Sequence, residues 1–245
     1  MYLVSLVLVT ILGGLLFGYD TAVISGAEQA LQKHLGLNAF WHGITASSAL
    51  IGCVIGGAIS GVCASRMGRR NSLRLSAVLL FLSALGSYYP EFIFFEKGDT
   101  SFSLILAFNF YRILGGVGVG LASAISPMYI AEVAPSEIRG KLVSCNQFAV
   151  IFGMLVVYFV NYMIKDGMTE EMLVSDGWRQ MFLSEAYPAA VFAILLFFVP
   201  KTPRYLVMEG NDLKALYVLE RINGTEKAKK IFSDIKSVTA EKTEK

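Results

Sequence analysis

Apolar residues run along most of this chain in stretches of about twenty, separated by short polar segments. A helix of that length crosses the hydrocarbon core of a bilayer, whereas helices of soluble proteins carry a polar face along their whole length. The pattern predicts an all-α membrane protein with a six-helix bundle in residues 1–200. The predicted spans are 3–25, 43–63, 73–89, 104–126, 141–163 and 181–200.

The composition points in the same direction. Hydrophobic residues make up 55% of the chain and charged residues 16%, whereas a soluble domain typically carries about 25% charged residues. The net charge of +2 is too small to indicate a nucleic-acid partner. We therefore exclude soluble enzymes, nucleic-acid-binding proteins and disordered proteins, and we expect the lipid bilayer as the surrounding medium. The first apolar run contains Asp20 and lacks a basic start, which favours a retained span over a signal peptide.

No motif indicates a cofactor, a metal ion or enzyme catalysis. The three cysteines, Cys53, Cys63 and Cys145, are scattered and form no CxxC pair. His34 and His42 have no acidic or thiol partner at ligand spacing, and we expect them in one solvated loop. The prediction is a protein without cofactor, metal or enzymatic activity.

The distribution of lysine and arginine predicts cytoplasmic termini. Six spans place both termini on one side, and basic residues accumulate on the cytoplasmic side of membrane proteins. The loops on the side of the termini, together with the segment after Pro200, hold sixteen basic residues against four on the other side. The short loops alone, with six against four, favour this orientation only slightly. The four on the outer side are Lys33, Lys97, Lys165 and Arg179.

Residues 201–245 differ from the rest of the chain. They contain ten basic and seven acidic residues, and apolar positions recur at helical spacing. We predict short amphipathic linker helices on the cytoplasmic face, broken near Asn223-Gly224, with a solvated tail as the alternative. The recurring apolar positions are Leu213, Leu216, Leu219 and Ile222.

Three ionisable side chains fall within the predicted spans: Asp20, Arg112 and Glu185. Each charge costs roughly 2.5–3.5 kcal/mol at a helix centre on insertion scales, so such groups are usually paired and functional. At 1.5 Å per residue they lie about 8, 12 and 7 Å from the outer ends of their helices, which predicts one shared layer. Two carboxylates beside one guanidinium leave one carboxylate uncompensated, and this favours proton uptake at moderate pH. A static ion pair beside a boundary glutamate is the alternative.

Small and polar residues within the spans have simpler explanations. Glycines spaced by four residues allow helix backbones to approach closely, and we interpret them as packing positions. Asn146 and Gln147, beside Ser144 in the fifth span, could bind a hydroxylated solute or a neighbouring helix, and the pattern leaves both open. The glycine pairs are Gly14/Gly18, Gly52/Gly56, Gly57/Gly61 and Gly116/Gly120.

Eight short strings occur in order along the chain. They are GGLLFGYD at 13–20, RMGRR at 66–70, YR at 111–112, SPMYIAEVAP at 126–135, IRGK at 138–141, NQF at 146–148, GWR at 177–179 and PRYL at 203–206. Together they resemble the sugar porter family of the major facilitator superfamily, and within it the bacterial xylose–proton symporters. The resemblance covers essentially the whole chain, but only the amino-terminal half of such a transporter with its linker helices. It implies a 3+3 inverted repeat.

The resemblance also implies roles for individual residues. It suggests Asp20 as the proton acceptor, Arg112 as its partner and Glu185 as the third member of the site. Uniporters of the family typically have asparagine after Phe-Gly-Tyr, so Asp20 favours proton symport. The implied substrate-binding residues are Gln147, Phe17 and Asn146. The implied cytoplasmic gating charges, which brace one state of the transporter, are Arg66, Arg69, Arg70, Glu132 and Arg139.

Two positions depart from the family pattern. Met154 stands where xylose symporters usually carry a second glutamine, which argues against a strict xylose specificity. Lys201 and Thr202 replace a usual Glu-Ser pair, which reverses one charge at the cytoplasmic face.

The predicted function is therefore uptake of a monosaccharide, a xylose-like pentose or a hexose, with a proton by alternating access. The expected location is the plasma membrane, the bacterial inner membrane. The chain is expected to act with a missing carboxy-terminal half, since alternating access needs two halves around a midplane site. The alternatives are a sugar-binding membrane sensor that does not transport, and an inactive truncated product.

Overall fold

The computed structural model describes residues 2–91 and 102–243, which are almost entirely helical. Lys97, one of the predicted outer basic residues, lies outside these ranges. The bundle elements are α1 (Tyr2–Leu35), α2 (Ala39–Met67), α3 (Arg69–Tyr88), α4 (Phe102–Val133), α5 (Arg139–Asp166), α6 (Glu170–Met172), the π-helical η1 (Leu173–Gly177), α7 (Trp178–Ser184) and α8 (Ala186–Leu195). The linker elements are α9 (Pro203–Met208), α10 (Asp212–Asn223) and α11 (Thr225–Thr243).

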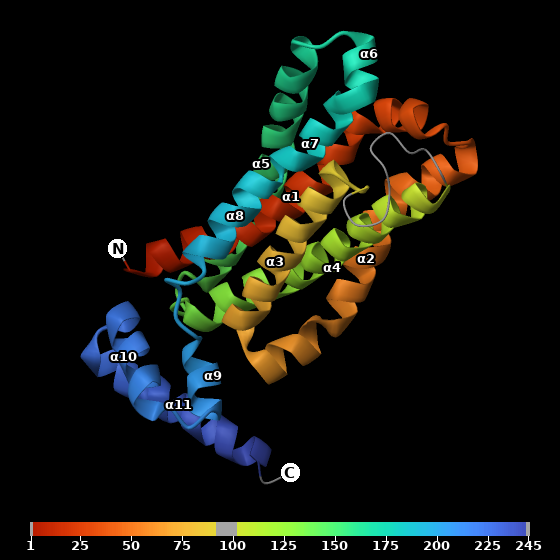
Figure 1. Cartoon of the computed structure of the whole chain (residues 1–245). Coiled ribbons are helices and arrows are strands. Elements are labelled where there is room, and N and C mark those ends of the chain that lie inside the picture. Colours follow the sequence, from red (N-terminus) through yellow and green to blue (C-terminus); the bar gives the residue numbers. More distant parts are fainter. Residues whose placement is uncertain (1, 92–101, 244–245) are drawn as a thin grey trace.

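The bundle has two layers. The helices α2, α4, α1 and α5 lie side by side in that order, and α3, α7 and α8 cover the row by packing on α4 and α1 (Figure 1). Four helices of the described chain, α1, α2, α4 and α5, are long and apolar enough to cross a membrane. The other two predicted spans correspond to α3, which begins with basic residues, and to α7 with α8, which are interrupted at Glu185. The chain is therefore an all-α protein that crosses the membrane several times.

The carboxyl end of α1 differs from the prediction. The helix continues to Leu35, ten residues beyond the predicted span, and α2 begins at Ala39. His34 and His42 are therefore helical and partly buried, and the prediction of one solvated loop for both was wrong. The extension persists because Leu31 and Leu35 pack in the apolar cluster around Trp178, whose ring centroid is 5.4 Å from that of His34.

Glycines form the closest contacts between neighbouring helices in the row of α2, α4, α1 and α5. A Cβ atom on Gly52 of α2 would lie 2.0 Å from the carbonyl oxygen of Ile113, and one on Gly116 of α4 would lie 2.0 Å from that of Ala49. These distances are far below van der Waals contact, so only glycine allows the two backbones to touch. A Cβ atom on Gly57 or Gly61 would meet no atom within 4 Å, although the backbone nitrogen of Gly57 lies 2.7 Å from the position of a Cβ atom on Gly120.

The linker helices pack on one another at the end of the bundle that also carries the N-terminus (Figure 1). Their apolar cluster contains Leu206 and Val207 of α9 with Ala215 and Val218 of α10. The helix break lies at Gly224, where φ is +79°. Of the predicted apolar positions, Leu219 is buried, together with Ala215 and Val218, whereas Leu213 is 86% exposed and lies outside the buried face.

Candidate functional site

Asp20 of α1 and Arg112 of α4 form an ion pair in the interior of the bundle. The Arg112 Nη1 atom donates a hydrogen bond of 2.6 Å to Asp20 Oδ1, and Nη2 lies 3.4 Å from the backbone oxygen of the same residue. The two residues are 1% and 2% exposed. A charged pair so far from water is held strongly, because little solvent screens the attraction.

Glu185 joins this pair from the junction of α7 and α8. It is 0% exposed, and its carboxyl group interacts electrostatically with both Asp20 and Arg112. The two carboxyl groups are close enough to interact, and neither Glu185 oxygen accepts a hydrogen bond from a donor within the described residues. Pro188 explains the junction, because proline lacks the N–H that would bond the carbonyl of Ser184 and thereby interrupts the helix.

The layer is unbalanced in charge and in hydrogen bonding. One guanidinium faces two carboxyl groups, and Arg112 Nε has no hydrogen-bond partner in the described chain. The Phe182 ring lies 5.0 Å from the guanidinium carbon and covers one side of it. An uncompensated carboxylate is unfavourable in a low dielectric, so the arrangement favours holding a proton on one of the two acids.

The predicted substrate-binding residues differ in how far they are buried. Phe17 is partly buried on α1, one turn before Asp20, and packs against the main apolar cluster. Gln147 of α5 is exposed. Asn146 is buried where α5 meets α1, since a Cβ atom on Gly14 would lie 2.7 Å from Asn146 Oδ1. Of the two open interpretations, Asn146 fits a helix contact and Gln147 fits a solute contact, because neighbouring helical residues point about 100° apart.

Among the predicted gating charges, Arg69 and Glu132 form an ion pair. The distance from Arg69 Nη2 to Glu132 Oε1 is 2.7 Å, and both side chains are largely buried. Arg69 also donates to the carbonyl of Ala64 at 3.0 Å. This pair joins the start of α3 to the end of α4 at the Pro200 end of the bundle.

The other three gating residues form no ion pair within the described residues. Arg70 Nη1 lies 3.4 Å from the carbonyl of Val199, and Arg139 Nη2 lies 3.4 Å from that of Ala134. Arg66 is exposed, although its backbone oxygen accepts a hydrogen bond of 3.1 Å from Tyr205. The structure thus brings together only part of the predicted cluster.

A second buried ion pair was missed by the sequence reasoning. Arg179 of α7 binds Glu91 through both ends of its guanidinium, with 2.8 Å from Nη1 to Oε2 and 2.5 Å from Nη2 to Oε1. Arg179 also donates to the carbonyl of Tyr88 at 3.0 Å and lies 4.5 Å from the Trp178 ring centroid. The prediction of an outer-loop arginine was wrong, because Arg179 is 5% exposed. A Trp-Arg pair next to an apolar run was the available signal.

Arg74 is a second residue that the sequence reasoning missed. Its Nε and Nη2 atoms donate to the carbonyl of Leu196 at 3.2 and 3.1 Å, where α8 has ended and its last carbonyls lack helical partners. The guanidinium also covers the ring of Phe197 at 4.6 Å. Arg74 therefore attaches α3 to the end of the sixth span.

Comparison with known proteins gives a consistent set of relatives. The family model described as "Sugar (and other) transporter" matches residues 6–245. The D-xylose-proton symporter of Escherichia coli is 49% identical over 96% of this chain and 51% of its own length. The arabinose-proton symporter of Bacillus subtilis is 41% identical, over 92% of this chain and 46% of its own length. The glucose transport protein of Synechocystis is 40% identical, over 88% and 45%.

Solved structures agree with the sequence relatives. The proton:xylose symporter XylE bound to 6-bromo-6-deoxy-D-glucose superposes with a TM-score of 0.93 at 47% identity, covering 98% of this chain and 54% of that one. The inward-open conformation of the E. coli xylose transporter XylE gives a TM-score of 0.88 at 48% identity, covering 96% and 56%. The fold is therefore that of the amino-terminal half of a major facilitator, and the chain spans about half the length of the relatives it matches.

Proposed function

Because this chain belongs to the sugar transporter family, a family of transporters rather than enzymes, we propose that it forms the amino-terminal half of a secondary active transporter. The transporter takes up a monosaccharide together with a proton. The observation that carries this proposal is the buried group of Asp20, Arg112 and Glu185. Two relatives named as proton symporters, for xylose and for arabinose, support the same activity.

Proton coupling follows from the imbalance of this group. With Asp20 ionised, Arg112 is held by its hydrogen bond of 2.6 Å. Proton uptake by Asp20 removes the charge that holds the guanidinium, and Glu185 then offers an alternative carboxyl partner. Such an exchange requires two acids within reach of one arginine, and it links the charge state of α1 to the position of α4.

Sugar binding is proposed for the surface near Phe17 and Gln147. An exposed amide can donate and accept hydrogen bonds with hydroxyl groups, and an aromatic face suits the apolar face of a sugar ring. Phe17 lies one turn from Asp20, so a bound sugar sits close to the proton site. Met154 cannot supply the second amide of the xylose pattern, so we expect the transporter to accept other pentoses or hexoses as well.

The exposed apolar side chains support a second half as a partner. Alternating access requires two halves that rock around a midplane site. The chain leaves large apolar side chains of α2 and α5 uncovered, in a surface that lipid and an opposing half would share. They include Val54, Ile59, Phe148, Ile151, Phe152 and Phe159.

The Pro200 end of the bundle is proposed to face the cytoplasm of a bacterial inner membrane, in agreement with the excess of basic residues there. In this orientation the ion pair of Arg69 and Glu132 lies at the inner mouth of the transporter. Its partial burial makes it stronger than a surface pair, and its separation would accompany movement of α3 against α4. We therefore propose that this pair carries the gating role, with Arg66, Arg70 and Arg139 as flanking charges.

Uptake measurements test the proposal. Membrane vesicles containing the full-length transporter, with this chain as its amino-terminal half, would be supplied with labelled xylose, arabinose or glucose. We expect accumulation of at least one sugar above the external concentration, and loss of this accumulation when a protonophore collapses the gradient. Accumulation that persists without a proton gradient would contradict proton coupling. Binding of a sugar with neither uptake nor counterflow would instead support the sensor alternative.

A further inference from the structure

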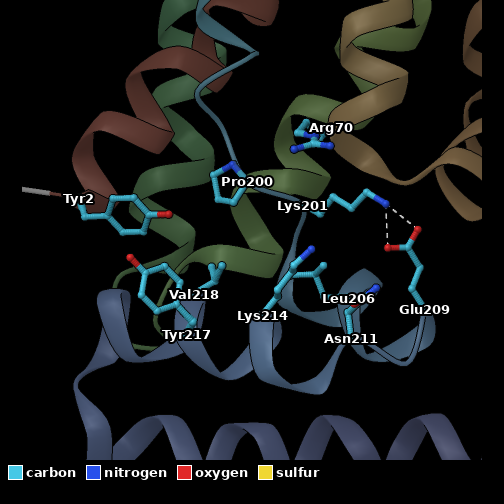
Figure 2. Close-up of a pocket in the computed structure, with 10 residues that line it drawn as sticks. All are labelled: Tyr2, Arg70, Pro200, Lys201, Leu206, Glu209, Asn211, Lys214, Tyr217 and Val218. Carbon is cyan, nitrogen blue, oxygen red and sulfur yellow. Dashed lines mark hydrogen bonds and ion pairs between the residues drawn. The ribbon is translucent and has the colours of Figure 1, made fainter.

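A cavity of about 380 Å³ lies between the bundle and the linker helices, immediately below the end of the sixth predicted span. Four segments form its walls: the start of α1, the start of α3, the connection at Pro200, and α9 with α10 (Figure 2). None of its lining residues belongs to the predicted proton site or to the predicted sugar site.

Basic side chains dominate this cavity. Arg70, Lys201 and Lys214 line it, and Glu209 is the one carboxylate among its lining residues. Lys201 already neutralises Glu209, with distances of 2.6 and 2.7 Å from its Nζ atom to the two carboxylate oxygens. The cavity therefore has an excess of positive charge that no acidic lining residue balances.

Two of these cations have hydrogen-bonding capacity to spare. Lys214 makes no hydrogen bond or ion pair within the described residues, and Figure 2 shows its side chain extending from α10 toward Pro200 and Arg70. Arg70 makes only the long contact of 3.4 Å to the Val199 carbonyl, and its buried Nε has no partner in the described chain. Donors that converge from two elements on one cavity are the arrangement that binds a multi-oxygen anion.

The other lining residues, which are tyrosines and aliphatic residues, are suited to an anion that carries an apolar group, such as a lipid. Tyr2 and Tyr217 lie on the same side of the cavity (Figure 2), while Leu206 and Val218 contribute apolar surface. Arg221 stacks on the Tyr2 ring, 3.8 Å from its centroid, and adds positive charge beside the tyrosines. Tyrosine with arginine or lysine is typical of the level of lipid headgroups.

The position in the proposed membrane agrees with this chemistry. Pro200 ends the sixth predicted span, and Phe197 and Phe198 just before it are 68% and 79% exposed. A phosphate in the cavity would therefore lie at headgroup depth, with apolar side chains beside it for acyl chains. Lys201, at the position where the family pattern has glutamate, increases the positive charge of this chain in particular.

We propose that this cavity binds a phosphate group, carried either by an anionic membrane lipid or by a soluble phosphate compound. Arg70 and Lys214 contact the phosphate oxygens, the tyrosine hydroxyls donate hydrogen bonds beside them, and Lys201 contributes long-range attraction. The inference does not depend on the transport activity, since the site is complete within the described residues of this chain.

Native mass spectrometry of the 245-residue chain in detergent tests the proposal. Titration with phosphatidylglycerol, with diacylglycerol and with inorganic phosphate separates the possible sources of binding. We expect phosphatidylglycerol to bind more tightly than diacylglycerol, and binding to weaken as salt is added. Binding of inorganic phosphate with equal affinity would identify a soluble phosphate compound as the ligand and would still support the site. Equal binding of diacylglycerol and phosphatidylglycerol would overturn it.

Charge variants locate the binding. Lys214→Gln removes an exposed, unpaired amino group, so folding is unaffected, and phosphatidylglycerol affinity should fall about tenfold. Lys201→Glu restores the family residue and should also weaken binding, whereas Glu209→Gln frees Lys201 and should strengthen it. Lys229→Gln, the same change at an exposed lysine of α11 outside the cavity, is the control and should leave affinity unaltered. Equal affinities of Lys214→Gln and Lys229→Gln would overturn the proposal, with circular dichroism checking that all variants retain their helix content.

Discussion

Two buried ion pairs, Arg179 with Glu91 and Arg112 with Asp20, differ in how their charges are balanced. Arg179 holds one carboxylate, that of Glu91, through two parallel hydrogen bonds, and the Trp178 ring lies 4.5 Å from its guanidinium carbon. Arg112 holds Asp20 through one short bond, while Glu185 stands beside both with no hydrogen bond within the described residues. The first arrangement satisfies the charges of its members, whereas the second leaves one acid without a partner.

This difference separates a structural pair from a site that can change state. A bidentate arginine–carboxylate pair is rigid, because both donors and both acceptors are used in one geometry. The Arg112 guanidinium has an Nε without a partner in the described chain and two carboxyl groups beside it, and we propose that a single proton changes which carboxyl group it holds. The charge count, rather than burial, thus distinguishes the proposed proton site from the pair of Arg179 and Glu91.

The largest expected effect is on transport. Asp20→Asn removes the group that exchanges a proton but retains its size and hydrogen bonding. In the full-length transporter we expect sugar to bind and equilibrate, while accumulation against a concentration gradient is lost. Vesicle uptake and counterflow measure the two properties separately. Normal accumulation in this variant would remove Asp20 from the coupling site.

A large effect on stability is expected at the balanced pair. Arg179→Met leaves the Glu91 carboxylate buried without this partner, and breaking a buried pair typically costs about 3–5 kcal/mol. Arg179→Lys retains the charge but loses the second hydrogen bond, so its stability should lie between those of the unaltered protein and Arg179→Met. The midpoints of thermal unfolding in detergent would measure the stability of both variants. An unaltered midpoint for Arg179→Met would show that the pair does not stabilise the fold.

A spectroscopic effect is expected at the unbalanced layer. Within the described residues, Arg112→Leu removes the cation that interacts with Asp20 and Glu185, and both acids then favour the neutral form. The infrared band of protonated carboxyl groups should be stronger than in the unaltered protein at the same neutral pH, and folding should be less affected than by Arg179→Met. If the band kept its intensity, the three residues would not act as one site.

The smallest effect is expected at an exposed pair. Lys33 hydrogen-bonds to Glu170 at the end of the bundle opposite Pro200, and this contact lowers the pKa of the Glu170 carboxyl group. Lys33→Met should therefore raise that pKa toward its ordinary value, measurable by carboxyl titration in an NMR spectrum, with no change in the unfolding midpoint. Both groups are mostly exposed, so water screens the attraction that the buried pairs retain. A marked loss of stability would contradict this distinction.

The sequence by itself determined the class of protein and the members of the buried charge layer. Long apolar runs leave no alternative to membrane helices, and the regular rise of a helix converts a position in the chain into a depth. Asp20, Arg112 and Glu185 could therefore be assigned to one layer without any knowledge of which helices touch. The motifs, in their order along the chain, also indicated the family.

Only the tertiary structure decided which side chains face each other across helices. Arg179 and Glu91 are 88 residues apart, and no local pattern specifies that α7 passes the end of α3. Asn146 and Gln147 look equivalent in sequence, yet one packs against α1 and the other is exposed, because the rotation of α5 is set by Gly14 and its neighbours. The buried face of α10 likewise depends on α9 and α11. Depth follows from the chain, whereas rotation and pairing follow from how the whole bundle packs.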